Sequence, residues 1–303
     1  MTQLLQQLAN GTVLGAQYAL IALGYTMVYG IIQLINFAHG EIFMIGAFGG
    51  LAVYTYLLGS DGHALVVLPV VLCGAILCST LTAVAMERFA YRPLRNAPRL
   101  APLITAIGVS IVLQEAVRTF YPRGNRQQPF PTILPERQFD VAGVNFSLIA
   151  VFVVVVAIAL MVMLHMFVQR SKTGRAMRAT SQDPDTAKLM GIDTNRIIVV
   201  TFALGAALAA VAGVLQGMLI GQVDFDMGFI GGLKAFTAAV LGGIGHIPGA
   251  VLGGFLLGIV EAIATQYIPQ GSAYKDVWAF VVLVLVLIFR PTGLLGRSVR
   301  TRA

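Results

Sequence analysis

Long stretches without a charged residue dominate this sequence. No Asp, Glu, Lys or Arg precedes Glu41, and five later charge-free runs have 19 or more residues: 42–60, 62–86, 141–169, 197–223 and 235–260. A helix needs about 20 apolar residues to cross a hydrocarbon core of ~30 Å. Segments such as Val151–Val156 lack the alternation of apolar and polar residues that a membrane β-barrel requires. The runs therefore predict an all-α polytopic membrane protein.

Composition excludes the soluble alternatives. Charged residues make up 11% of the 303-residue chain and hydrophobic residues 57%, whereas a soluble domain carries about 25% charge. A soluble enzyme, a disordered protein, a coiled coil and a disulfide scaffold are excluded. Cys73 and Cys78 share one apolar run, which favours buried thiols that fill apolar space over a metal or redox pair. No metal is therefore expected. The net charge of +7 is attributed to membrane topology, so no nucleic-acid partner is expected either.

The apolar segments predict a single transmembrane domain over residues 1–303, with about eight or nine crossings, some of them half-helices. We place them near 8–30, 40–58, 64–87, 101–121, 147–168, 197–221, 232–245, 249–268 and 273–290. The first segment is expected to be retained, because no basic region precedes it and no small-residue cleavage site follows it.

Positive charge divides the loops into two sets. Three stretches hold 14 of the 20 Lys and Arg residues: Arg88, Arg92, Arg95 and Arg99; Arg170, Lys172, Arg175, Arg178, Lys188 and Arg196; and Arg290, Arg297, Arg300 and Arg302. Cytoplasmic loops carry such an excess, so these stretches and the C-terminus are predicted to be cytoplasmic. The N-terminus is then external, unless 31–40 is re-entrant. The proline-rich external loop 122–146 is expected to be an ordinary connector without periodicity, with a docking surface for a binding protein as the alternative.

The cytoplasmic loop 169–196 contains a short helix signal. Asp183 can cap a helix at about 184–190, Pro184 suits its first position, and Asp185 and Lys188 complement the helix dipole. Gly191 suits a left-handed terminator. So short a helix is marginal alone. It either rests on the cytoplasmic ends of its own bundle, or it docks a partner protein through apolar side chains such as Ala187 and Leu189.

Two glycine-rich segments resemble each other in character. A helix break is predicted within 231–258, at Gly242, Gly243 and Pro248. The small residues spaced four apart in this segment favour close packing between helices. The alternative explanation is a broken helix beside a translocation path. Segment 36–50 likewise joins a polar start to small residues, which indicates a weak internal duplication. Together the two segments provide the candidate path residues Asn36, His39, Glu41, Thr237, Gly242, Gly243 and Gly245.

Three motifs resemble those of ABC-importer permeases of the branched-chain amino-acid class, of the LivH type. They are TGRAMRATSQDPDTAKLMGI at 173–192, INFAHGEIFMIGAF at 35–48 and KAFTAAVLGGIGHIPGAVLGG at 234–254. The resemblance runs along nearly the whole chain. It implies that a coupling helix in 173–192 contacts an ATPase subunit. The implied coupling residues are Gly174, Arg175, Arg178, Asp183, Pro184, Asp185, Ala187, Lys188, Leu189 and Gly191.

The resemblance also implies a set of partners in a bacterial inner membrane: a second homologous permease subunit, two ABC ATPase subunits and a periplasmic amino-acid-binding protein. The chain has no phosphate-binding G-x-x-x-x-G-K-[ST] motif, so we expect it to bind no cofactor, to be no enzyme, and to rely on ATP hydrolysis by partner subunits. The implied substrates are leucine, isoleucine and valine, with urea or short amides as the alternative.

The rival energy source is an ion gradient, as in a secondary amino-acid carrier. Its candidate ionisable residues are His39, Glu41, Glu115, Arg118, Lys234, His246 and Glu261, most of which fall at predicted span ends. Glu261 is placed deepest, where a proton relay is conceivable but a carboxyl bonded to a neighbouring helix is favoured. Glu115 and Arg118 are expected to pair locally.

Overall fold

The structure is a computed structural model that describes residues 2–59, 63–95, 97–98, 100–141, 143–290 and 292–296. Of the predicted basic residues, Arg99, Arg297, Arg300 and Arg302 lie outside the described residues. The helices are α1 (Thr2–Ile32), α2 (His39–Val53), α3 (Ala64–Met86), α4 (Leu100–Phe120), α5 (Leu148–Arg170), α6 (Lys172–Gln182), α7 (Pro184–Leu189), α8 (Thr194–Ile220), α9 (Met227–Gly242), α10 (Ile247–Tyr267) and α11 (Lys275–Phe289). Two π-helical turns, η1 (Tyr54–Leu58) and η2 (Glu87–Tyr91), extend α2 and α3, and a 3₁₀ turn η3 (Arg92–Leu94) follows.

Within the described residues, seven helices are long and apolar enough to cross a membrane: α1, α2 with η1, α3 with its extensions, α4, α5, α8 and α10. The apolar helices α9 and α11 are shorter, with 16 and 15 residues. The chain is a multi-pass helical membrane protein, and the predicted eight or nine crossings agree with these elements. The predicted break also occurs: α9 ends at Gly242, Gly243 has a φ of 105°, and Pro248 lies in the first turn of α10.

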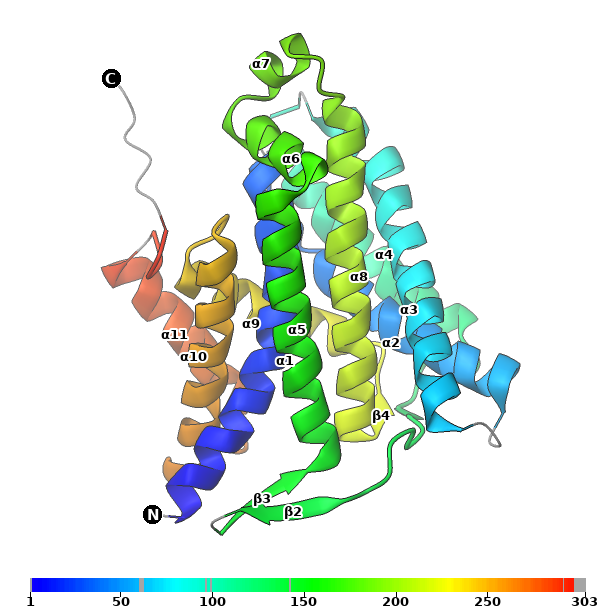
Figure 1. Cartoon of the computed structure of the whole chain (residues 1–303), viewed down its shortest axis with the longest axis vertical. Coiled ribbons are helices and arrows are strands. Elements are labelled where there is room, and N and C mark those ends of the chain that lie inside the picture. The colour runs from blue at the N-terminus through cyan, green and yellow to red at the C-terminus, as the bar shows by residue number, and fades with distance from the viewer. Residues whose placement is uncertain are drawn as a thin grey trace.

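Helices far apart in the sequence pack against each other (Figure 1). Helix α1 packs against α10 and α9, while α8 packs against α3 and α2. The short helices α2 and α9 also contact each other. The weak duplication suggested by segments 36–50 and 231–258 stays a prediction.

Glycines allow α1 and α10 to approach closely. A Cβ atom built on Gly15 would lie 2.6 Å from the Cα of Phe255, and one built on Gly254 would lie 2.6 Å from the Cα of Ala19. Neither contact leaves room for a side chain. Close helix packing, the favoured reason for the small residues of 231–258, therefore holds together with the helix break.

Segment 122–146 contains more regular structure than the sequence predicts. Strand β1 (Gln128–Pro129) pairs with β4 (Gln222–Val223), and β2 (Gln138–Val141) forms a hairpin with β3 (Val144–Ser147). The backbone N–H of Phe130 also donates to the carbonyl of Gly221. The expectation of an irregular loop over 122–146 was wrong, because β1 pairs with the distant strand β4 and β2 pairs with β3 next to it in the sequence. The hairpin lies at the same end as the N-terminus, and α7 lies at the opposite end (Figure 1).

Candidate functional site

The helix predicted at about 184–190 is present as α7, which begins at Pro184 as predicted and ends at Leu189, one residue earlier than predicted. The Asp183 carboxylate accepts hydrogen bonds from the backbone N–H groups of Asp185 at 3.0 Å and Thr186 at 3.1 Å. Pro184 occupies the first helical position. Gly191 follows with a φ of 82°, which glycine adopts without strain. Local capping chemistry thus forms this helix as expected from the sequence.

A second helix, α6, precedes α7 and was missed in the sequence. The Ser171 hydroxyl caps it by accepting from the Gly174 N–H at 2.8 Å, and Met177 on its buried face packs into the bundle. Arg178 donates to the carbonyl of Val168, and Arg175 donates to the carbonyl of Arg170 at 3.3 Å. These arginines therefore satisfy the last carbonyls of α5 and hold α6 against it. The sequence contained one signal for this helix, because Ser171 is a residue type that commonly caps a helix N-terminus.

The two interpretations of loop 169–196 apply to different parts of it. Helix α6 rests on the bundle, where it packs against α1, α5 and α8. Helix α7 projects beyond the other helices (Figure 1), and its apolar side chains Leu189 and Met190 are 87% and 77% exposed. Ala187 is buried, and Lys188 pairs with Asp185 at 2.9 Å. Helix α7 is therefore a capped, projecting helix whose exposed apolar side chains can contact a partner protein.

Three candidate path residues gather where α2 begins inside the bundle. The Tyr91 hydroxyl donates to the Asn36 side chain at 2.6 Å, and the Ser110 hydroxyl donates to Glu41 Oε1 at 3.0 Å. The His39 ring lies 4.8 Å from the Tyr25 ring in an edge-on arrangement. All three candidates are buried. Within the described parts of the chain, Glu41 Oε2 and His39 Nε2 find no hydrogen-bond partner.

The first turns of α9 pack against this cluster, but the other candidate path residues lie farther along the chain. A Cβ on Gly232 would lie 2.8 Å from the Cα of Gly40, so the starts of α2 and α9 touch. Thr237 is buried within α9 and donates to its own helix. Gly242, Gly243 and Gly245 form the turn to α10, with Gly245 facing Gly30 at the end of α1. The seven residues therefore do not form one cluster, and their role in a path stays a prediction.

Lys234 is the centre of a buried charge network that the sequence did not predict. Its ammonium group lies 2.7 Å from Glu261 Oε1 and 2.6 Å from Asp276 Oδ1, and the Tyr18 hydroxyl donates to Glu261 Oε2 at 2.9 Å. Lys234 is 5% exposed and lies midway along α9, not at a span end as predicted. The favoured state of Glu261, bonded to a neighbouring helix, is confirmed. Local pairing of Glu115 and Arg118 also occurs, at 3.0 Å.

Comparison with known proteins identifies the family. The family model described as the permease component of the branched-chain amino acid transport system matches residues 7–287. The chain belongs to this permease family.

Several relatives of this permease match along nearly their whole length. It is 49% identical over 299 residues to the high-affinity branched-chain amino acid transport system permease protein BraD of Pseudomonas aeruginosa, covering 97% of this chain and 96% of that protein. It is 47% identical over 301 residues to the corresponding protein LivH of Escherichia coli K12, with the same coverage. Among solved structures it resembles PsaBC from Streptococcus pneumoniae in complex with Fab, at a TM-score of 0.48 and 13% identity over 93% of this chain and 91% of that one. That weak likeness carries no functional conclusion.

In the permease, a chain of polar contacts joins the end of loop 169–196 to the start of α2. Asn195, in the first turn of α8, accepts a hydrogen bond from Arg95 at 2.5 Å. Arg95 and Arg92 both pair with the buried Glu87 in the π-helical turn η2. Tyr91 in the same turn donates to Asn36, as described above. Irregular helical turns of this kind often occur at functional hinges.

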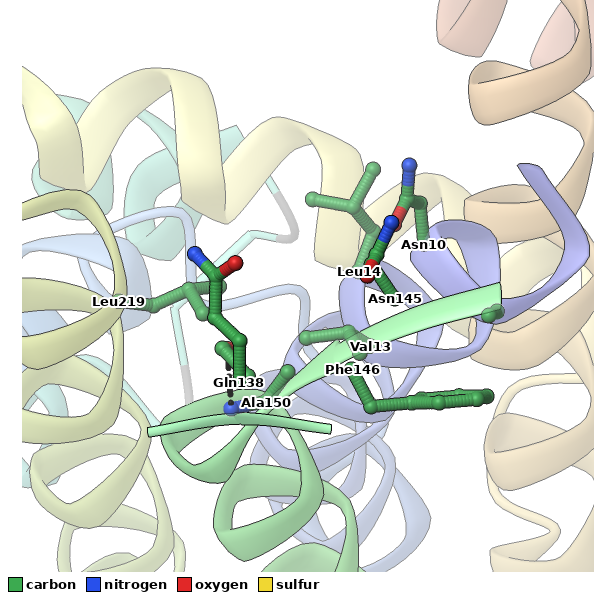
Figure 2. Close-up of a pocket in the computed structure, with 10 residues that line it drawn as sticks. Asn10, Val13, Leu14, Gln138, Asn145, Phe146, Ala150 and Leu219 are labelled. Carbon is green, nitrogen blue, oxygen red and sulfur yellow. Dashed lines mark hydrogen bonds between the residues drawn. The ribbon is translucent and has the colours of Figure 1, made fainter. Parts of the chain in front are cut away.

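A pocket of about 460 Å³ lies at the opposite end of the permease, between α1, the β2–β3 hairpin and α5. Figure 2 shows Asn10 and Asn145 on one side of it and Gln138 and Leu219 on the other. Gln6 ties the hairpin to α1, because its amide accepts from the Asn145 N–H at 2.8 Å and donates to the Asn145 carbonyl at 3.0 Å. Two hydrogen bonds therefore connect the hairpin to the bundle. Docking of a binding protein there stays a prediction.

Proposed function

We propose that this permease is the membrane-spanning subunit of an ATP-driven importer for leucine, isoleucine and valine in a bacterial inner membrane. A second permease subunit completes the path, two ATPase subunits bind at the α7 end, and a periplasmic amino-acid-binding protein docks at the hairpin end. The C-terminus is cytoplasmic. Relatives named as high-affinity branched-chain amino acid permeases support the substrate, and the distribution of Lys and Arg supports the orientation.

The projecting helix α7 is the observation that carries the ATP-driven mechanism. A capped helix with exposed Leu189 and Met190 is suited to a pocket on a partner protein. It lies between α6, which is fixed to α5, and α8, which spans the bundle. A push on α7 is therefore passed to both flanking helices. ATP is bound and hydrolysed by the partner subunits, and this chain holds no cofactor.

The contacts of Glu261 weigh against an ion-driven carrier. A proton relay needs a carboxyl that can exchange its proton, whereas Glu261 is bonded by both Lys234 and Tyr18. The alternative substrates, urea or short amides, are distinguished from leucine by the uptake test described next.

The test is a pull-down from membranes with the chain tagged, followed by uptake into liposomes that contain the purified assembly. We expect ATPase and permease subunits to copurify, and uptake of leucine to require ATP and the binding protein. Uptake driven by a proton gradient without ATPase subunits would overturn the proposal. ATP-driven uptake of urea or an amide, but not of leucine, would overturn the substrate alone.

A further inference from the structure

An apolar groove of about 520 Å³ opens beside α4, the start of α2 and the first turns of α9. Its wall carries five apolar side chains, from Phe37, Ile107, Ile111, Phe229 and Leu233. Of the lining residues in the described part of the chain, Ser110 and Gln114 are the polar ones. Ligand sites commonly have this character, with a largely apolar wall and a few placed polar groups.

Ser110 is presented to the groove as a hydrogen-bond acceptor. A hydroxyl has one proton, and Ser110 donates that proton to Glu41 Oε1 at 3.0 Å. The lone pairs of the Ser110 oxygen therefore remain to accept hydrogen bonds from a ligand in the groove. Glu41 is 1% exposed and lies behind the groove wall. A hydroxyl that donates to a carboxyl group is polarised and becomes a stronger acceptor, which suits the N–H groups of an ammonium ion.

Gln114 lies one helical turn from Ser110 on the same face of α4. Its amide supplies N–H donors that can bind a carboxylate. An ammonium acceptor and a carboxylate donor thus lie together beside an apolar wall. This arrangement complements an α-amino acid with a branched apolar side chain.

We propose that this groove is a transient subsite for the zwitterionic amino acid during translocation. Ser110 accepts from the ammonium group, Gln114 donates to the carboxylate, and the apolar wall receives the branched side chain. The inference rests on the proposed function and adds the residues that touch the substrate. Glu41 acts through Ser110 as a positioning residue, so the substrate meets no bare charge and is released readily.

The first test measures leucine uptake into liposomes containing the complete transporter. Ser110→Ala should lower uptake about tenfold at an unchanged amount of assembled transporter, which is the effect of losing roughly one hydrogen bond to a charged group. Ser110→Thr keeps the hydroxyl and should retain uptake. Val112→Ala, at an exposed position on α4 outside the groove, is the matched control. Equal uptake by Ser110→Ala and the unmutated transporter would overturn the subsite and leave the proposed function in place.

The second test does not depend on transport. With Cys73 and Cys78 replaced by alanine, the reaction of a water-soluble thiol reagent is followed at Ile107→Cys in the groove and at Val141→Cys on the β2–β3 hairpin, an exposed position outside the groove. L-leucine should slow labelling of Ile107→Cys several-fold. 4-Methylpentanoate, which lacks the ammonium group, should slow it much less, and neither compound should affect Val141→Cys.

Adding Ser110→Ala to Ile107→Cys should abolish the preference for leucine. Equal slowing by the two compounds would overturn the ammonium contact, and no slowing by leucine would overturn the whole subsite. Because labelling requires neither ATP nor the binding protein, this test separates failure of the subsite from failure of the proposed function.

Discussion

At the scale of single residues, Lys234 neutralises carboxylates contributed by two other helices. Its partner Glu261 is buried, whereas the Asp276 side chain is 40% exposed, so solvent screening weakens the second ion pair. Removing the cation leaves a buried carboxylate without a counter-charge. Removing Glu261 leaves Lys234 paired with Asp276. The two substitutions should therefore differ strongly.

Lys234→Met should destabilise the protein by about 3–5 kcal/mol, the cost of an uncompensated buried charge. Glu261→Gln should cost roughly 1 kcal/mol and retain ATP-dependent uptake. Thermal unfolding of the detergent-purified proteins measures the loss of stability in both variants. Uptake with ATP or with a proton gradient measures transport by Glu261→Gln. Similar losses of stability in the two variants would contradict the expected difference, and gradient-driven uptake that is lost in Glu261→Gln would support the proton relay.

Asp183 is the residue that holds α7. Hydrogen bonds from the Thr186 side chain and backbone lower the pKa of its carboxyl below the ordinary value of 3.8. A lowered pKa means that the cap is present above that value and is lost only as the pH falls through the folded-state pKa. The cap should therefore stay intact, and coupling through α7 should not vary with pH, between roughly pH 5 and 8.

Asp183→Ala and Gly191→Val should each reduce leucine uptake while the protein still inserts. The first removes the cap and the second forces a β-branched residue into a φ of 82°. Pull-downs measure the binding of ATPase subunits, which should weaken if α7 is their contact surface. Normal uptake and normal ATPase binding in both variants would refute the coupling role of α7.

At the scale of elements, the contact between α1 and α10 depends on glycine. Gly254→Ala puts a methyl group against the α1 backbone and should destabilise the fold by about 3 kcal/mol or more. Gly108→Ala on α4 is the matched control, because a Cβ there meets nothing within 4 Å. The amount of folded protein in membranes and its thermal unfolding measure both. Equal stability of the two variants would argue against close packing at Gly254.

The η2 turn should act as a link between α8 and α2. Arg95→Ala and Tyr91→Phe break its contacts to Asn195 and Asn36, so ATP hydrolysis should persist while leucine uptake per ATP falls several-fold. Arg88→Ala, an exposed residue of the same basic stretch, serves as control. If uptake per ATP is the same in all three variants, the turn does not transmit the motion.

At the scale of the whole molecule, the basic stretches predict the orientation of the bundle. The contact of Arg95 with Asn195 brings the first two stretches to one end, while the β2–β3 hairpin lies at the other. With Cys73 and Cys78 replaced, Leu189→Cys should react with an impermeant thiol reagent only from the cytoplasmic side, and Val141→Cys only from outside. The opposite pattern would invert the orientation.

Local chemistry explains what the sequence by itself determined. Hydropathy located the spans, Gly242 and Gly243 located the helix break, and Asp183 with Gly191 located α7, because each depends on residues a few positions apart. Only the tertiary structure decided which polar groups meet inside the bundle. Tyr18 and Glu261 are 243 residues apart, and Glu41 and Ser110 are 69 apart. Their pairing follows from how α1, α2, α4, α9 and α10 pack, which the spacing of residues along one helix does not encode.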